Sequence, residues 1–397
     1  MKYNIWTDCP KIPLTELLSF IVDNRGKTVP TAPSGHKLIA TNCVTNNSLF
    51  PTYEKIRYLS EKTYQTWFRA HPMPGDILFV NKGTPGRVCM VPNPVDFCIA
   101  QDMIALRADN SKIYNKYLFA ILRSREIQEQ IYNTNVGDVI PHFKKQFLSE
   151  LLIPVPDRKI QEYIGNLYYI LSYKAEHNKK INENLEKQAQ ALFQNLFIDN
   201  ARPEWKQGTV CDLGSIIGGS TPSKSKPEYY TDSGIAWITP KDLSVNKSKF
   251  IYHGENDITE LGLKNSSANV MPKGTVLFSS RAPIGYIAIA AGEVTTNQGF
   301  KSIVPKSEIG TAFVYYFLKY NLPMIEGMAS GSTFKEISGS VMKSVPAFVP
   351  DSETLNVFRL FCKPLFEQQK ILELQNQSLE KLRDTLLPKL MNGEIEL

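Results

Sequence analysis

Two long stretches of the chain carry apolar residues at helical spacing. In residues 158–198 and again in 352–392, apolar side chains recur every three or four positions. This pattern predicts an apolar stripe along one face of a helix. At ~1.5 Å per residue, a helix of this length would reach ~60 Å, which is further than a small domain is wide. We therefore predict two long antiparallel helices that pack in coiled-coil fashion, on each other or on helices of another protein.

The remaining sequence alternates short strand-like and helix-like stretches. Runs of β-branched and aromatic residues bounded by Gly and Pro predict strands at 75–80, 276–280 and 285–290. Helical spacing returns briefly at 114–132 and 311–320. These stretches predict α+β segments of mixed strands and short helices.

An internal repeat relates the two halves of the chain. Gly75 and Lys82 match Gly274 and Arg281, each 199 residues later. After a five-residue deletion the offset falls to 194, where the run 185–187 matches 379–381. Each half is thus a globular segment followed by a helix, which implies a pseudo-twofold relation. The predicted boundaries are 1–155, 156–200, 201–350 and 351–397.

Composition and charge narrow the class of protein. The 397 residues carry a net charge of +6 at a pI near 8.8, which suits an anionic partner without proving one. The six cysteines form no C-x-x-C pair, so we expect no zinc site. The sequence shows neither a signal peptide nor an apolar run long enough for a membrane span, so we expect a cytoplasmic protein.

A series of motifs in the second half carries a family resemblance. GGSTPSKSKPEYYTDSGIAWITPKDL (218–243), VLFSSRAPIGYIAIA (276–290), TTNQGFKSI (295–303) and GSTFKEISGSVMKSVPAFVP (331–350) stand in this order, before the C-terminal LEKLRDTLLPKLMNGEIEL (379–397). Together they resemble the type I restriction-modification specificity subunits. The first copy departs from the pattern, reading GHKLIATNCV (35–44) where the second reads GIAWITPKDL.

The resemblance implies a non-catalytic subunit that binds double-stranded DNA. Its two globular segments would be target-recognition domains, each reading one half of a bipartite sequence. Its helices would act as a spacer and dock two modification subunits, which bind S-adenosylmethionine and methylate adenine. No cofactor is expected on this chain, and whether two restriction subunits join stays open.

Candidate contact residues follow from what DNA reading requires. Bases are read by donors and acceptors on loops, and phosphates are held by basic residues. Gln298 could pair with an adenine edge, but its match to Gln101 favours a structural role. The DNA-contact candidates are Lys82, Thr84, Arg87, Lys144, Lys145, Lys224, Lys226, Lys241, Ser279, Ser280, Arg281, Asn297, Lys301, Thr333 and Lys335. The leucines expected to dock partner helices are Leu185, Leu192, Leu196, Leu379, Leu386 and Leu390.

Two other classes of protein stay open at this point. No G-x-G-x-x-G, Walker or G-x-S-x-G motif is found. Pro156-Asp157-Arg158-Lys159 evokes a nuclease motif, but it lies at a predicted helix start, where Asp157 fits an N-cap. One alternative is a methyltransferase or endonuclease with an unrecognised catalytic site. The other is a helical scaffold that binds proteins and never contacts DNA.

Overall fold

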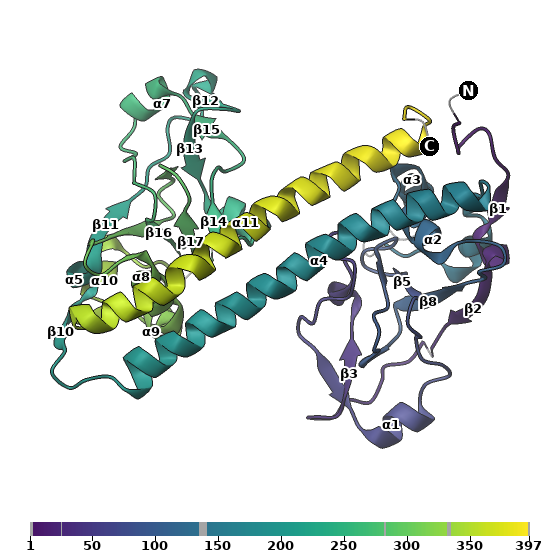
Figure 1. Cartoon of the computed structure of the whole chain (residues 1–397), viewed down its shortest axis with the longest axis horizontal. Coiled ribbons are helices and arrows are strands. Elements are labelled where there is room, and N and C mark those ends of the chain that lie inside the picture. Colours follow the sequence, from purple (N-terminus) through teal and green to yellow (C-terminus); the bar gives the residue numbers. More distant parts are fainter. Residues whose placement is uncertain (1–2, 25, 135–140, 282, 332–334, 396–397) are drawn as a thin grey trace. The chain divides into compact units, whose positions relative to one another are not determined.

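The computed structural model describes residues 3–24, 26–134, 141–281, 283–331 and 335–395, which form two compact units. Unit 1 comprises Met1–Asn178 and Gln375–Leu397, and unit 2 comprises Lys179–Leu374. Helices α4 (Arg158–Gln194) and α11 (Ser352–Met391) therefore contribute one part to each unit (Figure 1). Within the described part of the chain, no helix has the length and apolar content that a membrane span requires.

Unit 2 contains a five-stranded and a four-stranded sheet. The five-stranded sheet has the order β11-β19-β16-β17-β14, and the four-stranded sheet has the order β12-β15-β13-β18. The strands of the first sheet are β11 (Gly214–Gly218), β14 (Phe250–Ile251), β16 (Val276–Ser280), β17 (Ile284–Ala290) and β19 (Lys301–Pro305). Those of the second are β12 (Tyr230–Thr231), β13 (Ile235–Ile238), β15 (Asp257–Ile258) and β18 (Thr295–Thr296).

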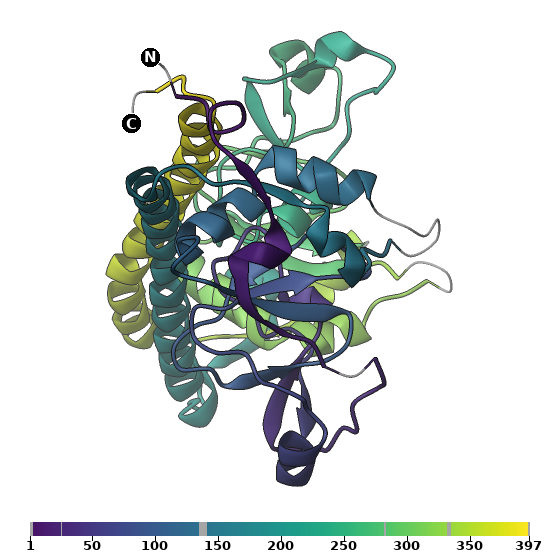
Figure 2. The same ribbon diagram turned by 90° about the vertical axis from the view of Figure 1, so that its right-hand side faces the viewer.

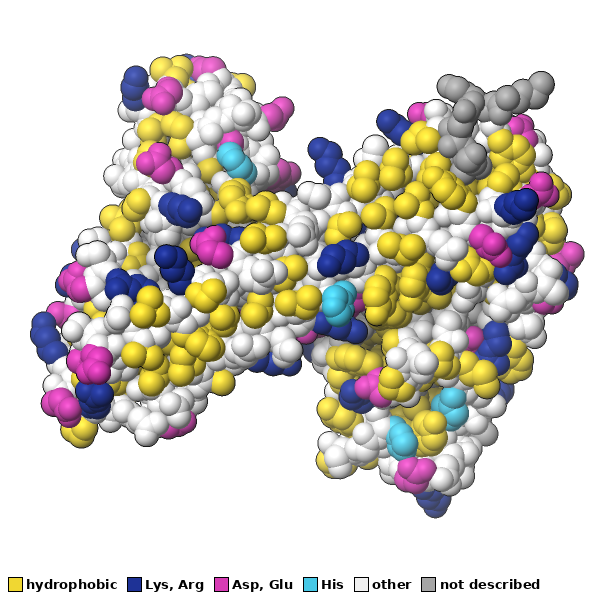
Figure 3. All heavy atoms as spheres, in the orientation of Figure 1, with side chains coloured by type: hydrophobic (Ala, Val, Ile, Leu, Met, Phe, Trp, Pro, Cys, Tyr) yellow, Lys and Arg dark blue, Asp and Glu magenta, His cyan; other side chains and the backbone are white. Residues whose placement is uncertain are grey.

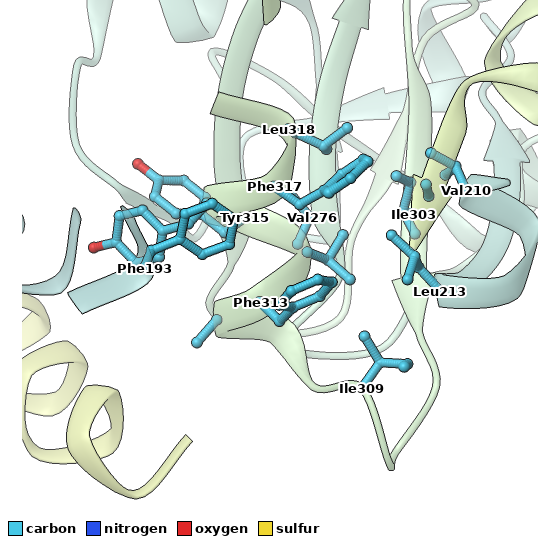
Figure 4. Packing of buried hydrophobic residues seen from close by; sticks show 14 of the residues in the cluster. Phe193, Val210, Leu213, Val276, Ile303, Ile309, Phe313, Tyr315, Phe317 and Leu318 are labelled. Carbon is cyan, nitrogen blue, oxygen red and sulfur yellow. The ribbon is translucent and has the colours of Figure 1, made fainter. Parts of the chain in front are cut away.

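Short helices connect and cover these sheets, and one further strand pair lies near α11. The helices are α5 (Val210–Leu213), α6 (Pro240–Val245), α7 (Glu260–Lys264), α8 (Thr311–Tyr320), α9 (Leu322–Gly327) and α10 (Gly339–Ser344). The pair is β10 (Lys206–Thr209) with β20 (Pro346–Val349). Helix α8 supplies Phe313 and Phe317 to the main core of unit 2, where they pack with Val276, Ile303 and Leu213 (Figure 4). Both the strand at 276–280 and the helix at 311–320 coincide with the sequence prediction.

Unit 1 builds the same kind of scaffold from the first half of the chain. Its sheets have the orders β2-β8-β5-β6 and β4-β3-β7. The strands are β2 (Leu18–Val22), β3 (His36–Ile39), β4 (Arg57–Leu59), β5 (Ile77–Val80), β6 (Val88–Met90), β7 (Phe97–Ile99) and β8 (Met103–Ala108), with β1 (Lys11–Pro13) pairing β9 (Leu152–Pro154). The helices are α1 (Glu61–Thr66), α2 (Asn115–Leu122) and α3 (Arg125–Asn133).

The strand pairings repeat from one unit to the other. In unit 1 Ile77 pairs with Leu106, and in unit 2 the matching Val276 pairs with Ile303. The parallel pair β3–β7 has its counterpart in β13–β18. Gly86 and Gly285, which occupy the same place in the repeat, both have φ near +90°, where a side chain is strained. The sequence repeat is therefore a repeat of topology.

In unit 1 the long helices pack through an apolar seam. The first part of α4 and the last part of α11 face each other through Leu167, Leu171, Leu386 and Leu390. Gly165 lets α4 approach α2, because a Cβ there would lie 2.5 Å from the backbone nitrogen of Tyr117. The N- and C-terminal segments lie side by side (Figure 2), and the backbone N–H of Ile5 donates to the carbonyl of Met391 at 3.0 Å.

In unit 2 a buried ion network joins both long helices to the core. Glu186 of α4 forms ion pairs with Lys249 and with Lys319 of α8. Lys249 also donates to the Tyr316 hydroxyl at 2.9 Å and to Gln369 of α11 at 2.8 Å. Burial alone would raise the pKa of Glu186, but the two lysines lower it to about 2. The Glu186 carboxylate is therefore ionised at neutral pH.

Candidate functional site

In unit 2 a polar cavity lies where strands of both sheets end. Strands β11, β13, β16 and β18 finish at this edge, and β17 and β19 begin there. The connecting loops therefore gather on one side of the scaffold, an arrangement that often carries binding residues. The cavity has a volume of about 680 Å³. It is lined by Thr221, Lys224, Tyr230, Trp237, Thr239, Pro240, Lys241, Asp242, Glu255, Asn256, Arg281, Asn297, Gln298 and Gly299.

The cavity wall combines cations, amides and aromatic rings. Lys241 donates to Glu255 at 2.6 Å, and this carboxylate raises the pKa of the lysine. The Thr221 hydroxyl donates to the Gln298 side-chain oxygen, which fixes the orientation of an exposed amide. Trp237 is largely buried, and its indole N–H donates to the Ser220 carbonyl at 3.0 Å. Such a wall offers donors, acceptors and positive charge to a polyanionic ligand.

Arg281 stands at the rim with two charged neighbours. It directly follows β16, and its backbone forms an isolated β-bridge with Glu336. Arg281 Nη1 lies 3.8 Å from one Glu336 carboxylate oxygen, and Lys301 Nζ lies 3.7 Å from the other. The carboxylate is therefore placed between two cations that it contacts only loosely.

Unit 1 has a related but different edge. Lys82, Thr84 and Arg87 lie in the loop between β5 and β6, and Lys82 forms a backbone bridge with His142. This bridge corresponds to that between Arg281 and Glu336. Lys145 pairs with Asp23 just after β2, and Lys144 is exposed beside it.

The predicted contact residues of unit 2 do not all meet at the cavity. Lys224, Lys241, Arg281 and Asn297 line the cavity of unit 2 together, and Lys301 lies beside Glu336, the carboxylate that Arg281 also approaches. Lys226, near Glu228 at 3.6 Å, and the exposed Lys335 do not line it. Thr333 lies outside the described residues.

Ser279 and Ser280 are not available to a ligand in this structure. Both are fully buried. The Ser279 hydroxyl donates to the Pro283 carbonyl at 2.9 Å, and the Ser280 hydroxyl donates to the Gly299 carbonyl at 3.1 Å. Both serines therefore hold the turns of the edge, and we remove them from the set of DNA-contact candidates.

Several cavity residues had no signal in the sequence. Tyr230, Glu255 and Asn256 come from segments far from Arg281 along the chain, and only the pairing of β12 and β13 with β15 brings them together. The aromatic pair Tyr230 and Trp237, with ring centroids 5.7 Å apart, is likewise a product of the fold. Only Lys224, Lys241, Arg281 and Asn297 of this wall were indicated by the sequence.

Comparison with known proteins agrees with this architecture. The model of the type I restriction modification DNA specificity domain matches residues 26–187 and again 203–389. The chain belongs to this specificity family. The chain is 40% identical over 184 residues to the type I restriction enzyme MjaIX specificity subunit of Methanocaldococcus jannaschii, a match that covers 45% of this chain and 42% of that protein. It is 24% identical over 401 residues to the HindI specificity subunit of Haemophilus influenzae, covering 81% of this chain and 86% of that protein.

A solved structure supports the fold. The S subunit of the type I restriction-modification system from M. genitalium superimposes with a TM-score of 0.57 at 18% identity, covering 96% of this chain and 98% of that one. The relatives are specificity subunits, a class that is not catalytic. Among the residues that the structure describes, His, Cys, Asp and Glu side chains form no group of three that could hold a metal ion.

The leucines predicted to dock partners are used within this specificity subunit. Leu192 and Leu196 pack against the core of unit 2, and Leu386 and Leu390 line the seam of unit 1. Leu185 and Leu379 are half-buried. The apolar stripe that predicted the helices is thus their inward face, and it leaves little surface for a partner.

Other apolar residues face solvent on the same helices. In unit 1, α4 exposes Tyr163 and Ile170, the latter to 61%. In unit 2, α11 exposes Val357, Leu360 and Phe361, with Leu360 also at 61%. Hydrophobic side chains gather along the long helices on the face shown in Figure 3. Tyr163 and Val357 match in the repeat at the offset of 194, so each unit presents such a surface at a related place.

Proposed function

We propose that this specificity subunit reads a bipartite DNA sequence, one half-site per unit, through the sheet edges that carry Lys82 and Arg281. The observation that carries the proposal is the repeat of this edge, with a cation after the central strand in both units of a chain that belongs to a DNA specificity family. The polar cavity of unit 2 supplies base-edge donors and acceptors next to phosphate-binding cations. The net charge of +6 favours the encounter with DNA.

The two units differ where base readers are expected. In unit 2 the strand β13 and the turn after it supply Trp237 and Lys241 to the cavity. At the matching places unit 1 has Leu38 and Asn42. The scaffold residues repeat while the wall residues change, and this difference supports two distinct half-sites.

We further propose that the helices dock two modification subunits and hold the units at the spacing of the half-sites. The exposed apolar surfaces of α4 and α11 support this, since apolar patches of this kind commonly mark protein interfaces. Because the two surfaces lie at related places in the repeat, each can dock one of two copies of the same partner. S-adenosylmethionine would then be bound by the modification subunits, with no cofactor on this chain.

The proposal is tested by methylome sequencing of a host with and without the chain. Loss of one bipartite adenine-methylation motif is the expected result. Exchange of residues 201–350 for those of another family member should alter one half of the motif and leave the other half and the spacer unchanged. If both halves change, or if no motif is lost, the assignment of one half-site per unit is wrong.

A direct binding assay separates a DNA reader from a scaffold. The assembled complex should bind the identified duplex with an affinity that falls steeply with salt, as counterion release requires. A complex that assembles but shows no salt-dependent DNA binding would favour the scaffold. Methyl transfer by the isolated chain would instead favour an enzyme.

A further inference from the structure

The Glu336 carboxylate occupies an anion position between two cations. Its oxygens lie 3.8 Å from Arg281 and 3.7 Å from Lys301, and the backbone bridge with Arg281 holds it there. These separations are too long for good hydrogen bonds. Arg281 and Glu336 are 38% and 40% exposed, so water screens the pair and little free energy is needed to part it. An incoming anion with better geometry could therefore take the place of the carboxylate.

The internal repeat indicates which kind of anion would replace the Glu336 carboxylate. Unit 1 keeps a cation at the matching place, Lys82, on the same backbone bridge, but it has His142 where unit 2 has Glu336. Lysine is a point charge that binds phosphate well, whereas a planar arginine fork is what two-pronged recognition of a guanine edge uses best. A position that keeps its charge but not its shape between two different half-sites suits the DNA backbone, which is the same at every sequence.

We propose that Arg281 and Lys301 bind one backbone phosphate of the second half-site, and that Glu336 takes the place of that phosphate when DNA is absent. The inference rests on the proposed function. Base reading then falls to the other residues of the cavity, among them Lys224, Tyr230 and Lys241. Glu336 acts as an internal competitor that weakens binding to every sequence alike.

The test is anisotropy titration of the full chain, assembled with its modification subunits, on labelled duplexes. The duplexes are the cognate site and its single-base-pair variants in the second half-site, each at several salt concentrations. Arg281→Ala should weaken binding to all of them by the same factor, roughly tenfold at 0.1 M salt, and reduce the log–log salt slope by ~0.9. Arg281→Lys, which installs the residue of unit 1, should keep both the affinity and the base preferences close to those of the parent.

Removal of the competing negative charge should change the DNA affinity in the opposite direction. Glu336→Gln should tighten binding to every duplex several-fold with no change in base preference. Glu308→Gln is the matched control, because Glu308 is exposed near the other end of β19 and its loss should leave binding unchanged.

The outcomes separate the two proposals. If the parent complex reads its site but Arg281→Ala loses discrimination at a single base pair, Arg281 is a base reader and the phosphate assignment is overturned. The same holds if Glu336→Gln weakens binding. If the parent complex binds no duplex, the proposed function itself fails.

Discussion

Replacement of Glu186 by glutamine should destabilise unit 2 because it leaves a buried cation without its counter-charge. The side chain of Lys249 is only 6% exposed and that of Glu186 18%. Loss of one partner of such a pair costs ~3–5 kcal/mol. Lys249 keeps its bonds to Tyr316 and Gln369 and lies 4.3 Å from the Phe366 ring centre. We therefore expect the free energy of unfolding to fall by about 3 kcal/mol, the lower end of this range.

The assay is thermal unfolding of the full chain together with hydrogen exchange of α8. For a unit of this size ~3 kcal/mol corresponds to a melting point lower by roughly 6–12 °C. The control is Glu183→Gln, an exposed glutamate one turn earlier on α4, which should stay within ~0.5 kcal/mol of the parent. The double variant Glu186→Gln/Lys249→Met should recover much of the loss, since it removes both charges.

The loss of stability at acid pH gives an independent check, because the pKa of Glu186 fixes the direction of the effect. The lowered pKa of Glu186, about 2, means that its ionised form stabilises the fold. That contribution is complete above the unfolded pKa of ~4.3 and is lost as the pH falls through about 2. The stability difference between the parent and Glu186→Gln should shrink over this window. Equal melting points for Glu186→Gln and Glu183→Gln at pH 7 would refute the reasoning.

Three further predictions concern other parts of the chain. Asp351→Ala should cost ~1–2 kcal/mol in urea unfolding, because Asp351 caps α11 by accepting from the Thr354 N–H at 2.8 Å and also accepts from Trp205; an effect no larger than that of an exposed Asp→Ala change would contradict the cap. Gly285→Ala should cost ~1–3 kcal/mol, since φ is +92° and the new Cβ would meet Leu322 at 2.6 Å, whereas Gly292→Ala, where nothing lies within 4 Å, should be tolerated. Ile170→Glu combined with Leu360→Glu should abolish co-purification with modification subunits while the melting point stays unchanged, and retention of both subunits would place the docking surface elsewhere.

The local sequence pattern was sufficient to predict those helices and strands whose ends are marked by Gly or Pro. The strand at 276–280 and the helix at 311–320 form as expected because turn residues bound them and apolar runs fill them. The predicted helix at 114–132 is instead two helices. Arg123 lies at the break, where its guanidinium donates to the carbonyls of Thr45, Ser48 and Val88. These partners come from other parts of the chain, so no local pattern could indicate the break.

The candidate site was predictable only in part. The cations around Arg281 were found because they lie in loops next to recognisable motifs. The hydroxyl chemistry of the two buried serines at the end of β16 suggests DNA contact, but nearby carbonyls use those hydroxyls. The leucine stripe revealed the helices and not their free face, because periodicity shows that one face is apolar and cannot show what covers it.

The division of the chain into units has a consequence for biosynthesis. Unit 2 is one uninterrupted stretch, so a ribosome delivers all of it before residues 375–397 emerge. Unit 1 begins first but includes Leu387 and Met391 in its core, so it cannot close before these residues have been synthesised. The customary order, in which the N-terminal part folds first, is therefore reversed here. A released chain that ends at residue 374 should display a finished second unit and an open, chaperone-accessible first one.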